Sequence, residues 1–333
     1  MTAPTTIDLA WQGLSSLPEL PDGWRVAARI YLEGNALSSL PDEIGECRQL
    51  QALHLDGNQL TALPDSIGRL STLKTLNLHH NQLTHLPDSL WELINLETLS
   101  IGDNPIDVLP DRIGRLTKLR ELYIHGMGLT AVPDNIGNLT RLRTLDLGHN
   151  ALTELPDAVG NLTNLTNFLY LSDNQLTTLP ETIGRLTTLN YLNLSHNRFA
   201  ELPPVIGRLT GLQELRLYNN RLTTLPAALG RLTNLVELYV RDNQLAELPE
   251  AVGRLSNLTH LDLRNNRLTT LPEALSELTN LQSLDLRGNR LTAVPDWLPA
   301  LPHLRKLDLR WNKLRSGVAA LETMKQRKVL VYL

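Results

Sequence analysis

The chain has 333 residues, 20% of them charged, and a formal net charge of −4 at pH 7. Charges of both signs are mixed along it, so no strong field attracts nucleic acid or a membrane surface, and neither is expected as a partner. The single cysteine excludes an internal disulfide, which agrees with a reducing compartment. The N-terminus has no basic start and no apolar run, and no stretch approaches the ~20 apolar residues that span a bilayer. These features predict a cytoplasmic protein.

One phrase, Leu-x-x-Asn-x-Leu-x-x-Leu-Pro, recurs along almost the whole chain with a period of 23 residues. A fixed repeat of this length indicates stacked structural units and not a globular core around one active site. Its asparagines are Asn35, Asn58, Asn81, Asn104, Asn150, Asn174, Asn197, Asn220, Asn243, Asn266, Asn289 and Asn312.

The repeat that begins at Leu50 shows how each unit is built. Leu53 and Leu55 alternate with polar residues, which is typical of a short strand with one buried face. Asn58 follows where the chain turns, and its side chain is expected to satisfy backbone groups in its own and the neighbouring coil, forming an asparagine ladder. Pro64 suits a return segment on the outer face, and Gly68 is expected to ease the bend back.

Fourteen rungs follow from this spacing, and the terminal ones are atypical. In the first rung Pro4 replaces the first leucine and Gln12 replaces the asparagine. After the last rung, Gly317 to Arg327 is predicted to form a short helix and Lys328 to Leu333 a closing strand. The expected organisation is a degenerate N-terminal capping repeat at 1–26, a repeat array at 27–316 and a C-terminal cap at 317–333, because terminal units have one face in water.

Two irregularities interrupt the array. Met127 stands where the sixth rung should have its asparagine, which predicts a local gap in the ladder. The interval from Asn150 to Asn174 contains one extra residue. The insertion is either a slip tolerated in the loop before a strand or a bulge that changes the direction of Phe168 and Tyr170.

The repeated phrase resembles the leucine-rich repeat, in its 23-residue form with Leu-Pro and Ile-Gly. It is similar to the cytoplasmic group that includes Ras-suppressor-like proteins, plant intracellular Ras-group-related proteins and many bacterial proteins. The resemblance implies an α/β fold: a right-handed solenoid, or horseshoe, with a concave parallel sheet of about 14 strands and short helical or 3-10 turns on the convex side. It also implies that the concave face binds another protein.

Tyrosines are concentrated at strand positions that face outward on the predicted concave surface. Tyrosine at an interface buries a large area and keeps a polar tip, whereas strand propensity alone would also place it in a strand. Arginines flank these rings in neighbouring rungs. The predicted partner-binding residues are Phe168, Tyr170, Tyr191, Tyr218, Tyr239, Arg216 and Arg241.

Further along the same face, arginines such as Arg264, Arg287 and Arg310 stand beside aspartates such as Asp285 and Asp308. They form either a cross-strand ladder that neutralises itself or an arginine-rich site for an acidic partner. The carboxylates argue against nucleic acid as that partner.

His149, Asp173 and His196 occupy one turn position in three successive rungs. They are a candidate metal site, but His and Asp also suit a tight turn, and the two histidines lie about two strand spacings apart, roughly 9–10 Å. No phosphate-binding loop, His-Glu-x-x-His or Cys-x-x-Cys pattern occurs, and no nucleophile stands beside a base.

The sequence therefore predicts a monomeric, non-catalytic scaffold without cofactors that binds a protein on its concave face, in intracellular signalling. Two alternatives remain open at this point. One is a secreted bacterial effector that uses the same scaffold. The other is a metal-binding or hydrolytic site on the His/Asp rim.

Overall fold

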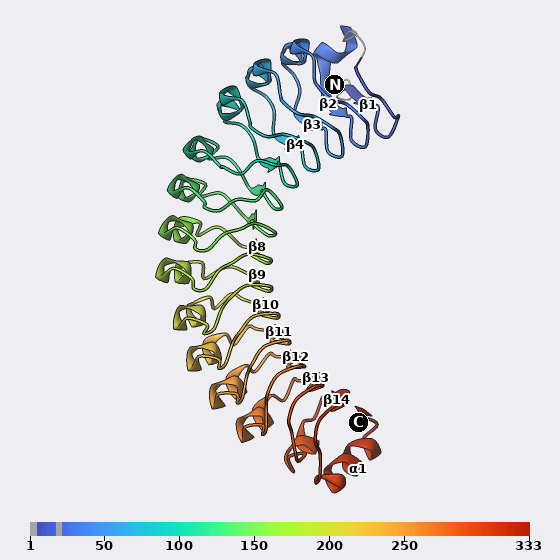
Figure 1. The fold of residues 1–333 in the computed structure, drawn as a ribbon, viewed down its shortest axis with the longest axis vertical. Coiled ribbons are helices and arrows are strands. Elements are labelled where there is room, and N and C mark those ends of the chain that lie inside the picture. Colours follow the sequence, from blue (N-terminus) through green and yellow to red (C-terminus); the bar gives the residue numbers. More distant parts are fainter. Residues whose placement is uncertain (1–4, 18–21) are drawn as a thin grey trace. The chain divides into compact units, whose positions relative to one another are not determined.

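The computed structural model describes residues 5–17 and 22–333, and the predicted opening of the first rung at Pro4 lies outside them. The chain forms two compact units, Met1–Leu165 and Thr166–Leu333. In each unit, strands alternate with short 3-10 helices along the chain, and the two kinds of element lie on opposite sides of the coils (Figure 1).

The strands after the second are only three residues long, which matches the short alternation of apolar and polar residues in each repeat. The first unit contains β1 (Thr5–Asp8), β2 (Ala27–Tyr31), β3 (Ala52–His54), β4 (Thr75–Asn77), β5 (Thr98–Ser100), β6 (Glu121–Tyr123) and β7 (Thr144–Asp146). The second contains β8 (Phe168–Tyr170), β9 (Tyr191–Asn193), β10 (Glu214–Arg216), β11 (Glu237–Tyr239), β12 (His260–Asp262), β13 (Ser283–Asp285), β14 (Lys306–Asp308) and β15 (Leu330–Tyr332).

The helices on the other side are 3-10 helices, and most of them follow a Leu-Pro pair. The first unit has η1 (Asp22–Val26), η2 (Asp42–Glu46), η3 (Asp65–Arg69), η4 (Asp88–Glu92), η5 (Asp111–Arg115), η6 (Asp134–Asn138) and η7 (Asp157–Asn161). The second has η8 (Glu181–Arg185), η9 (Pro204–Arg208), η10 (Ala227–Arg231), η11 (Glu250–Arg254), η12 (Glu273–Glu277), η13 (Leu298–Ala300) and one α-helix, α1 (Val318–Gln326).

Within each unit every strand pairs in parallel with the next strand along the chain. The register keeps equivalent residues opposite each other, so Leu215 pairs with Leu192 and with Leu238. The predicted solenoid with a parallel sheet and 3-10 turns on the other side is confirmed. α1 and β15 lie in the segments expected to form a short helix and a closing strand, and β15 raises the number of strands to fifteen. The division into two caps and an array stays a prediction.

The core consists of stacked leucine rows that the repeat supplies at fixed positions. In the repeat that begins at Leu50, the side chains of Leu53, Leu55, Ile67 and Leu70 are 0% exposed. Cys47 takes one of these apolar positions, and burial raises the pKa of its thiol. Each coil buries its apolar side against the next, which is why the units need their neighbours within the stack.

The asparagine ladder is present and fixes the turn after each strand. The Asn58 side chain donates to the carbonyl oxygens of Leu55 in its own coil and Leu32 in the preceding coil, both at 2.9 Å, and accepts from the Leu37 N–H at 3.0 Å. One amide thus satisfies buried backbone groups in two coils. Because this pattern recurs, the strand face presents its outward side chains in straight columns.

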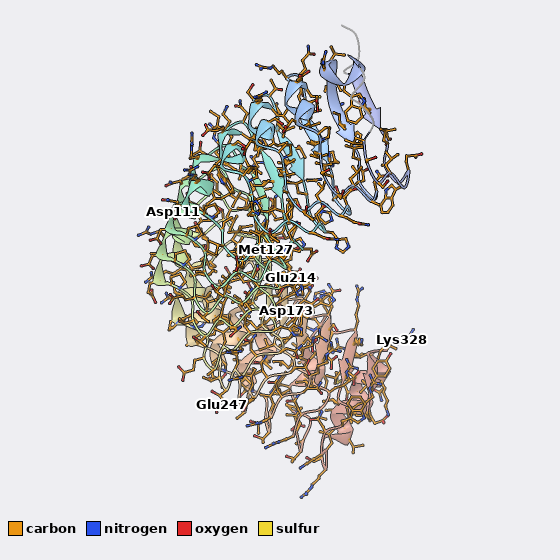
Figure 2. All side chains as sticks on the ribbon, turned by 45° about the horizontal axis from the view of Figure 1, so that its top comes forward. Asp111, Met127, Asp173, Glu214, Glu247 and Lys328 are labelled. Carbon is orange, nitrogen blue, oxygen red and sulfur yellow. The ribbon has the colours of Figure 1, made fainter. Side chains whose placement is uncertain are left out.

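Met127 breaks the ladder at the predicted place (Figure 2). In most other repeats the residue two after the ladder asparagine donates its N–H to the asparagine of the next repeat, as Leu83 does to Asn104. The corresponding N–H of Ile106 donates instead to the carbonyl oxygen of Asn104, at 2.8 Å. The thioether sulfur is a much weaker acceptor than an amide oxygen, and the backbone N–H is satisfied within its own turn. The gap is local, because Asn150 continues the ladder.

The glycine of the Ile-Gly pair has a different role from the one expected. Gly68 does not have a positive φ, so it is not needed to bend the chain. A Cβ on Gly68 would lie 2.6 Å from the carbonyl oxygen of Ser89 in the next 3-10 helix. Glycine is required because neighbouring helices approach closely.

The extra residue before Asn174 is absorbed ahead of the strand. Phe168 pairs with Tyr191 and Tyr170 with Asn193, in the same register as the other strands. The segment between the turn at Thr163 and Asn164 and the start of β8 is one residue longer than its counterpart before β6. This observation supports the interpretation as a loop slip, since Phe168 and Tyr170 keep the direction of their columns. The boundary between the two units, after Leu165, falls at the same place.

Candidate protein-binding surface

Each repeat places one residue with φ of 52–68° directly before its ladder position. This left-handed conformation is easy for glycine and tolerated by Asn, Asp and His. Trp11 and Trp311 adopt it as well, at the first and last repeats. The turn position is therefore a backbone requirement of the repeat, and the side chains found there satisfy it.

His149, Asp173 and His196, the candidate metal ligands, all have this conformation, with φ of 53–54°. His149 belongs to the first unit and the other two to the second. His196 Nδ1 lies 3.7 Å from Asp173 Oδ1, and its Nε2 lies 2.9 Å from the Asn219 amide nitrogen. Throughout residues 5–17 and 22–333, no three His, Cys, Asp or Glu side chains are grouped so as to hold a metal ion. The turn requirement accounts for these residues without a metal.

The predicted partner-binding residues all lie on the strand face of the second unit, and we call them the aromatic–arginine patch. Its first part is a cluster of three rings. Phe168 stacks on Tyr170 with ring centroids 5.6 Å apart and meets Tyr191 edge-on at 5.4 Å. Tyr170 and Tyr191 are 5.0 Å apart. Such contacts hold the rings rigidly relative to one another.

Arg216 connects Tyr239 to this cluster, and Arg241 forms a separate contact with Tyr218. The Arg216 guanidinium lies 5.3 Å from the Tyr191 ring and 5.5 Å from the Tyr239 ring, and Arg241 lies 4.3 Å from the Tyr218 ring. Cation–π contacts of this kind contribute roughly 0.5–1 kcal/mol at exposed sites and restrict the side chains. The patch thus consists of one connected set of rings around Arg216 and a second pair, Arg241 and Tyr218, on the same unit.

Two glutamates that the sequence pattern did not single out complete the patch. Glu214 accepts a hydrogen bond from Arg216 Nε at 2.6 Å, and Glu237 accepts one from the Tyr239 hydroxyl at 2.5 Å. Burial, followed by this hydrogen bond and the charge of Glu237, raises the pKa of Tyr239. The two glutamates continue the column of Tyr191, because Glu214 pairs with Tyr191 on one side and with Glu237 on the other. This shared strand position was the signal available in the sequence.

The residues of the patch differ in exposure, and one differs from expectation. Phe168 is 40% exposed, and Tyr170, Tyr218 and Tyr239 are half-buried. Tyr191 is only 8% exposed, so the expectation of a uniformly exposed aromatic patch is wrong at this residue. Its burial raises the pKa of its hydroxyl group. Tyr191 supports the surrounding rings, because the side chains of neighbouring strands cover it.

The arginines further along pair with aspartates in their own strand and in the next. Arg287 Nη2 lies 2.6 Å from Asp285 Oδ2, and Arg287 Nε lies 3.3 Å from Asp308 Oδ2. Arg310 pairs with Asp308 at 2.7 Å in the same way. These contacts favour the interpretation that the arginines and aspartates form a ladder that neutralises itself. They disfavour a basic site that is free for a partner.

In the first unit, His125 lies between two carboxylates. Its Nε2 is 3.3 Å from Asp103 Oδ2 and its Nδ1 is 3.4 Å from Asp146 Oδ2. The ring rests on the backbone of Gly102, where a Cβ would come within 2.8 Å of it. Burial raises the pKa of Asp146, while the N–H of Gly148 and the charge of His125 oppose that rise. The sequence places these residues in three successive repeats, but it does not show the contacts.

Known proteins agree with this architecture. The chain matches the leucine-rich repeat region over residues 65–167, 111–190 and 179–261, and the leucine rich repeat over residues 256–314 and 49–70. Together these matches cover well over half of the chain. This chain is a leucine-rich repeat protein. The matching families are repeat families, and leucine-rich repeat proteins are typically non-catalytic. No curated protein matches the chain.

Solved structures extend the comparison. A leucine-rich repeat protein of Leptospira interrogans is 33% identical, with a TM-score of 0.71, over 99% of this chain and 96% of that one. The plant peptide hormone receptor RGFR1, solved in complex with RGF2, is also 33% identical, with a TM-score of 0.78. The alignment covers 92% of this chain but only 51% of the receptor chain. InlJ of Listeria monocytogenes, at 24% identity and a TM-score of 0.80, shares the fold.

Among the described helices, none has the length and apolar character needed to cross a lipid bilayer.

Proposed function

We propose that this leucine-rich repeat protein is a non-catalytic scaffold that binds a peptide or protein partner on the aromatic–arginine patch. The observation that carries the proposal is the connected cluster of Phe168, Tyr170 and Tyr191, with Arg216 held between two tyrosine rings. Tyrosine and arginine dominate the binding energy of many interfaces. Because these side chains are already fixed by one another, little conformational entropy is lost on association.

The comparison with the plant receptor supports a peptide or protein as the ligand class. RGFR1 is a peptide hormone receptor, and its structure was solved in complex with RGF2. The second unit of this protein offers a rigid row of aromatic and guanidinium groups that suits an extended peptide. Arg216 is committed to Glu214 at 2.6 Å, so it contributes mainly its flat face, whereas Arg241 lies 3.9–4.0 Å from its nearest carboxylates. An acidic or carbonyl-rich segment of the partner is therefore expected opposite Arg241.

A selection from a random linear peptide library displayed on phage tests this proposal and does not require an identified partner. Calorimetry then measures the affinity of the enriched peptides for the wild-type protein and for a variant that has both Phe168→Ala and Tyr218→Ala. We expect affinity to fall at least about 30-fold, equivalent to ~2 kcal/mol. Tyr191 is left intact because it is buried, and its truncation would confuse binding with stability.

The matched control is Arg231→Ala with Arg254→Ala, two exposed residues on the opposite side, at the ends of η10 and η11. Peptides that bind the patch should keep their affinity for this variant. Equal binding of the selected peptides to wild type and to the Phe168/Tyr218 variant, with unchanged melting curves, would place the contact surface elsewhere.

We also propose that the protein belongs to the 23-residue cytoplasmic type and acts in intracellular signalling. The support is the Leu-Pro and Ile-Gly spacing in the sequence and one buried, unpaired cysteine, Cys47. Fractionation of cells that express the native gene tests the compartment. Recovery of the protein from the culture medium would instead favour the alternative of a secreted effector.

A further inference from the structure

An open polar groove with a volume of about 950 Å³ runs along the second unit beside the starts of β9 to β13. Two residues from each of these five repeats line it, together with His303 before β14. One stands directly before each strand, as Asn190 and Gln213 do, and the other stands three residues before the strand, as Asn234 and Asn257 do. The groove lies beside the column that contains Tyr191, and the proposed peptide-binding function makes no use of it.

The groove contains no Lys, Arg, Asp or Glu among its lining residues. The repeat does not require this, because the same position before the strands of the first unit carries charges: Lys74, Glu97, Arg120 and Arg143. The strand face next to the groove is also heavily charged. An uncharged lining over five successive repeats is therefore a specific property of this segment, and it disfavours an anionic polymer such as nucleic acid.

The side chains of the groove have hydrogen-bonding capacity to spare. Asn234, Asn257 and Asn280 each donate to a backbone carbonyl oxygen at 2.8–2.9 Å, which fixes their orientation. Their Oδ1 atoms accept no hydrogen bond from the described residues. The carboxamides of Asn190 and Gln213 likewise have no partner within the described part of the chain. Donors and acceptors are thus repeated at the strand spacing of about 4.8 Å.

A ligand for this groove must be uncharged, elongated and rich in groups that both donate and accept hydrogen bonds. Sugar hydroxyl groups have these properties. A peptide would also need apolar pockets for its side chains, and Val236 is the one aliphatic lining residue larger than alanine. Phe168, which is 40% exposed and 5.4 Å from the Tyr191 ring, lies next to the first lining repeat and offers a flat face for stacking on a sugar ring.

We propose that this groove binds a neutral oligosaccharide. The carboxamides of Asn190 and Gln213 bond to successive sugar units, and the fixed Oδ1 atoms of Asn234, Asn257 and Asn280 accept hydrogen bonds from the hydroxyl groups of the chain. Binding of this kind leaves the outer end of the aromatic–arginine patch, around Arg241, accessible. The site is separate from the proposed peptide site except at Phe168.

The test uses the full-length protein and a panel of neutral hexasaccharides of glucose, mannose, xylose and N-acetylglucosamine, with a heparin hexasaccharide as the acidic comparison. Calorimetry should detect at least one neutral sugar and no heparin binding. Asn190→Ala with Gln213→Ala should lower the association constant at least about tenfold. Arg143→Ala, at the equivalent place in the first unit, should leave it unchanged.

Each contrary outcome overturns the proposal. No binding of any neutral sugar at millimolar concentration would mean that the groove is solvated surface only. Undiminished binding to the Asn190/Gln213 variant would place the sugar site elsewhere. Loss of a selected peptide in that variant, without sugar binding, would make the groove part of the peptide site. Both mutated side chains are exposed, so unchanged thermal unfolding shows that the variant is folded.

Discussion

At the scale of single residues, backbone geometry explains side chains that look functional in the sequence. His196 and Asp173 fit a metal site by residue type, but both occupy a turn with φ of 54°. Glycine, asparagine and aspartate fill the same place in other repeats. A chemical motif that coincides with a repeated conformational requirement has to be weighed against that requirement first.

A pair of substitutions at His196 distinguishes the two roles. We expect His196→Gly to stay within about 1 kcal/mol of the wild-type stability, because glycine adopts the left-handed turn freely. His196→Val should be less stable than His196→Gly by roughly 1–2 kcal/mol, because a β-branched side chain clashes there. Urea unfolding measures both. If the two variants were equally stable, the turn would not be what selects this residue.

The contacts of Asp308 lower the pKa of its carboxyl group. It is 1% exposed and accepts hydrogen bonds from Arg310 Nη2 at 2.7 Å and Nε at 3.0 Å. Burial alone would raise its pKa, but the Arg310 hydrogen bonds and the charges of Arg287 and Arg310 outweigh burial and hold the pKa below 3.8. The unfolded chain therefore takes up this proton first as the pH falls.

It follows that Asp308 stabilises the fold above pH 3.8 and that this contribution disappears as the pH falls through its lowered pKa. We expect Asp308→Asn to lower the free energy of unfolding at pH 7 by about 1–3 kcal/mol, with a difference from wild type that narrows in acid. Denaturant titrations across pH measure this. Asp107→Asn, on an exposed loop, is the control and should change stability by less than about 0.5 kcal/mol. A difference that stays constant down to the acid limit would contradict the ionic role.

At the scale of elements, the repeat predicts which residues form strands and which are buried, because a period of two and a fixed unit length leave few alternatives. It does not predict how closely coils approach. The glycine of the Ile-Gly pair fits a bend and a close contact equally well in the sequence. The structure decides for the contact, since Gly68 has an ordinary φ and faces the Ser89 carbonyl oxygen. Likewise, the spacing of the tyrosines predicts that they share the strand face but not that Tyr191 is buried.

Gly253 in η11 makes the helix contact testable. A Cβ there would collide with the backbone carbonyl oxygen of Ala274 in η12. We expect Gly253→Ala to destabilise the protein by about 1–3 kcal/mol, because the neighbouring backbone has to move. Gly23→Ala in η1, where a Cβ meets nothing within 4 Å, should not be destabilising. Thermal unfolding of the two variants side by side measures the contrast, and a neutral Gly253→Ala would show that the helices can separate at little cost.

At the scale of the whole molecule, the composition argues against some classes of binding partner but does not identify one. The net charge of −4 predicts weak attraction to polyanions, but several arginines still line one face of the second unit. The structure shows why they do not form a basic site: Arg264 lies 3.4 Å from Asp262, and Arg287 lies 2.6 Å from Asp285. The cancellation is local, strand by strand. The partner's identity cannot follow from the sequence, because the repeat fixes the scaffold and leaves the outward columns free to vary.

This local cancellation gives the last prediction. Wild-type protein should not bind fluorescein-labelled single-stranded DNA at ~150 mM salt, because each arginine of the ladder has a carboxylate beside it. Asp262→Asn with Asp285→Asn should create measurable binding by fluorescence anisotropy that weakens steeply with added salt. The double substitution removes the carboxylate beside Arg264 and the closer of the two carboxylates beside Arg287. Asp107→Asn with Asp134→Asn removes the same number of charges from exposed sites in the first unit. If that control bound DNA equally well, net charge and not the ladder would govern the interaction, and the arginines would have to be regarded as available to a partner.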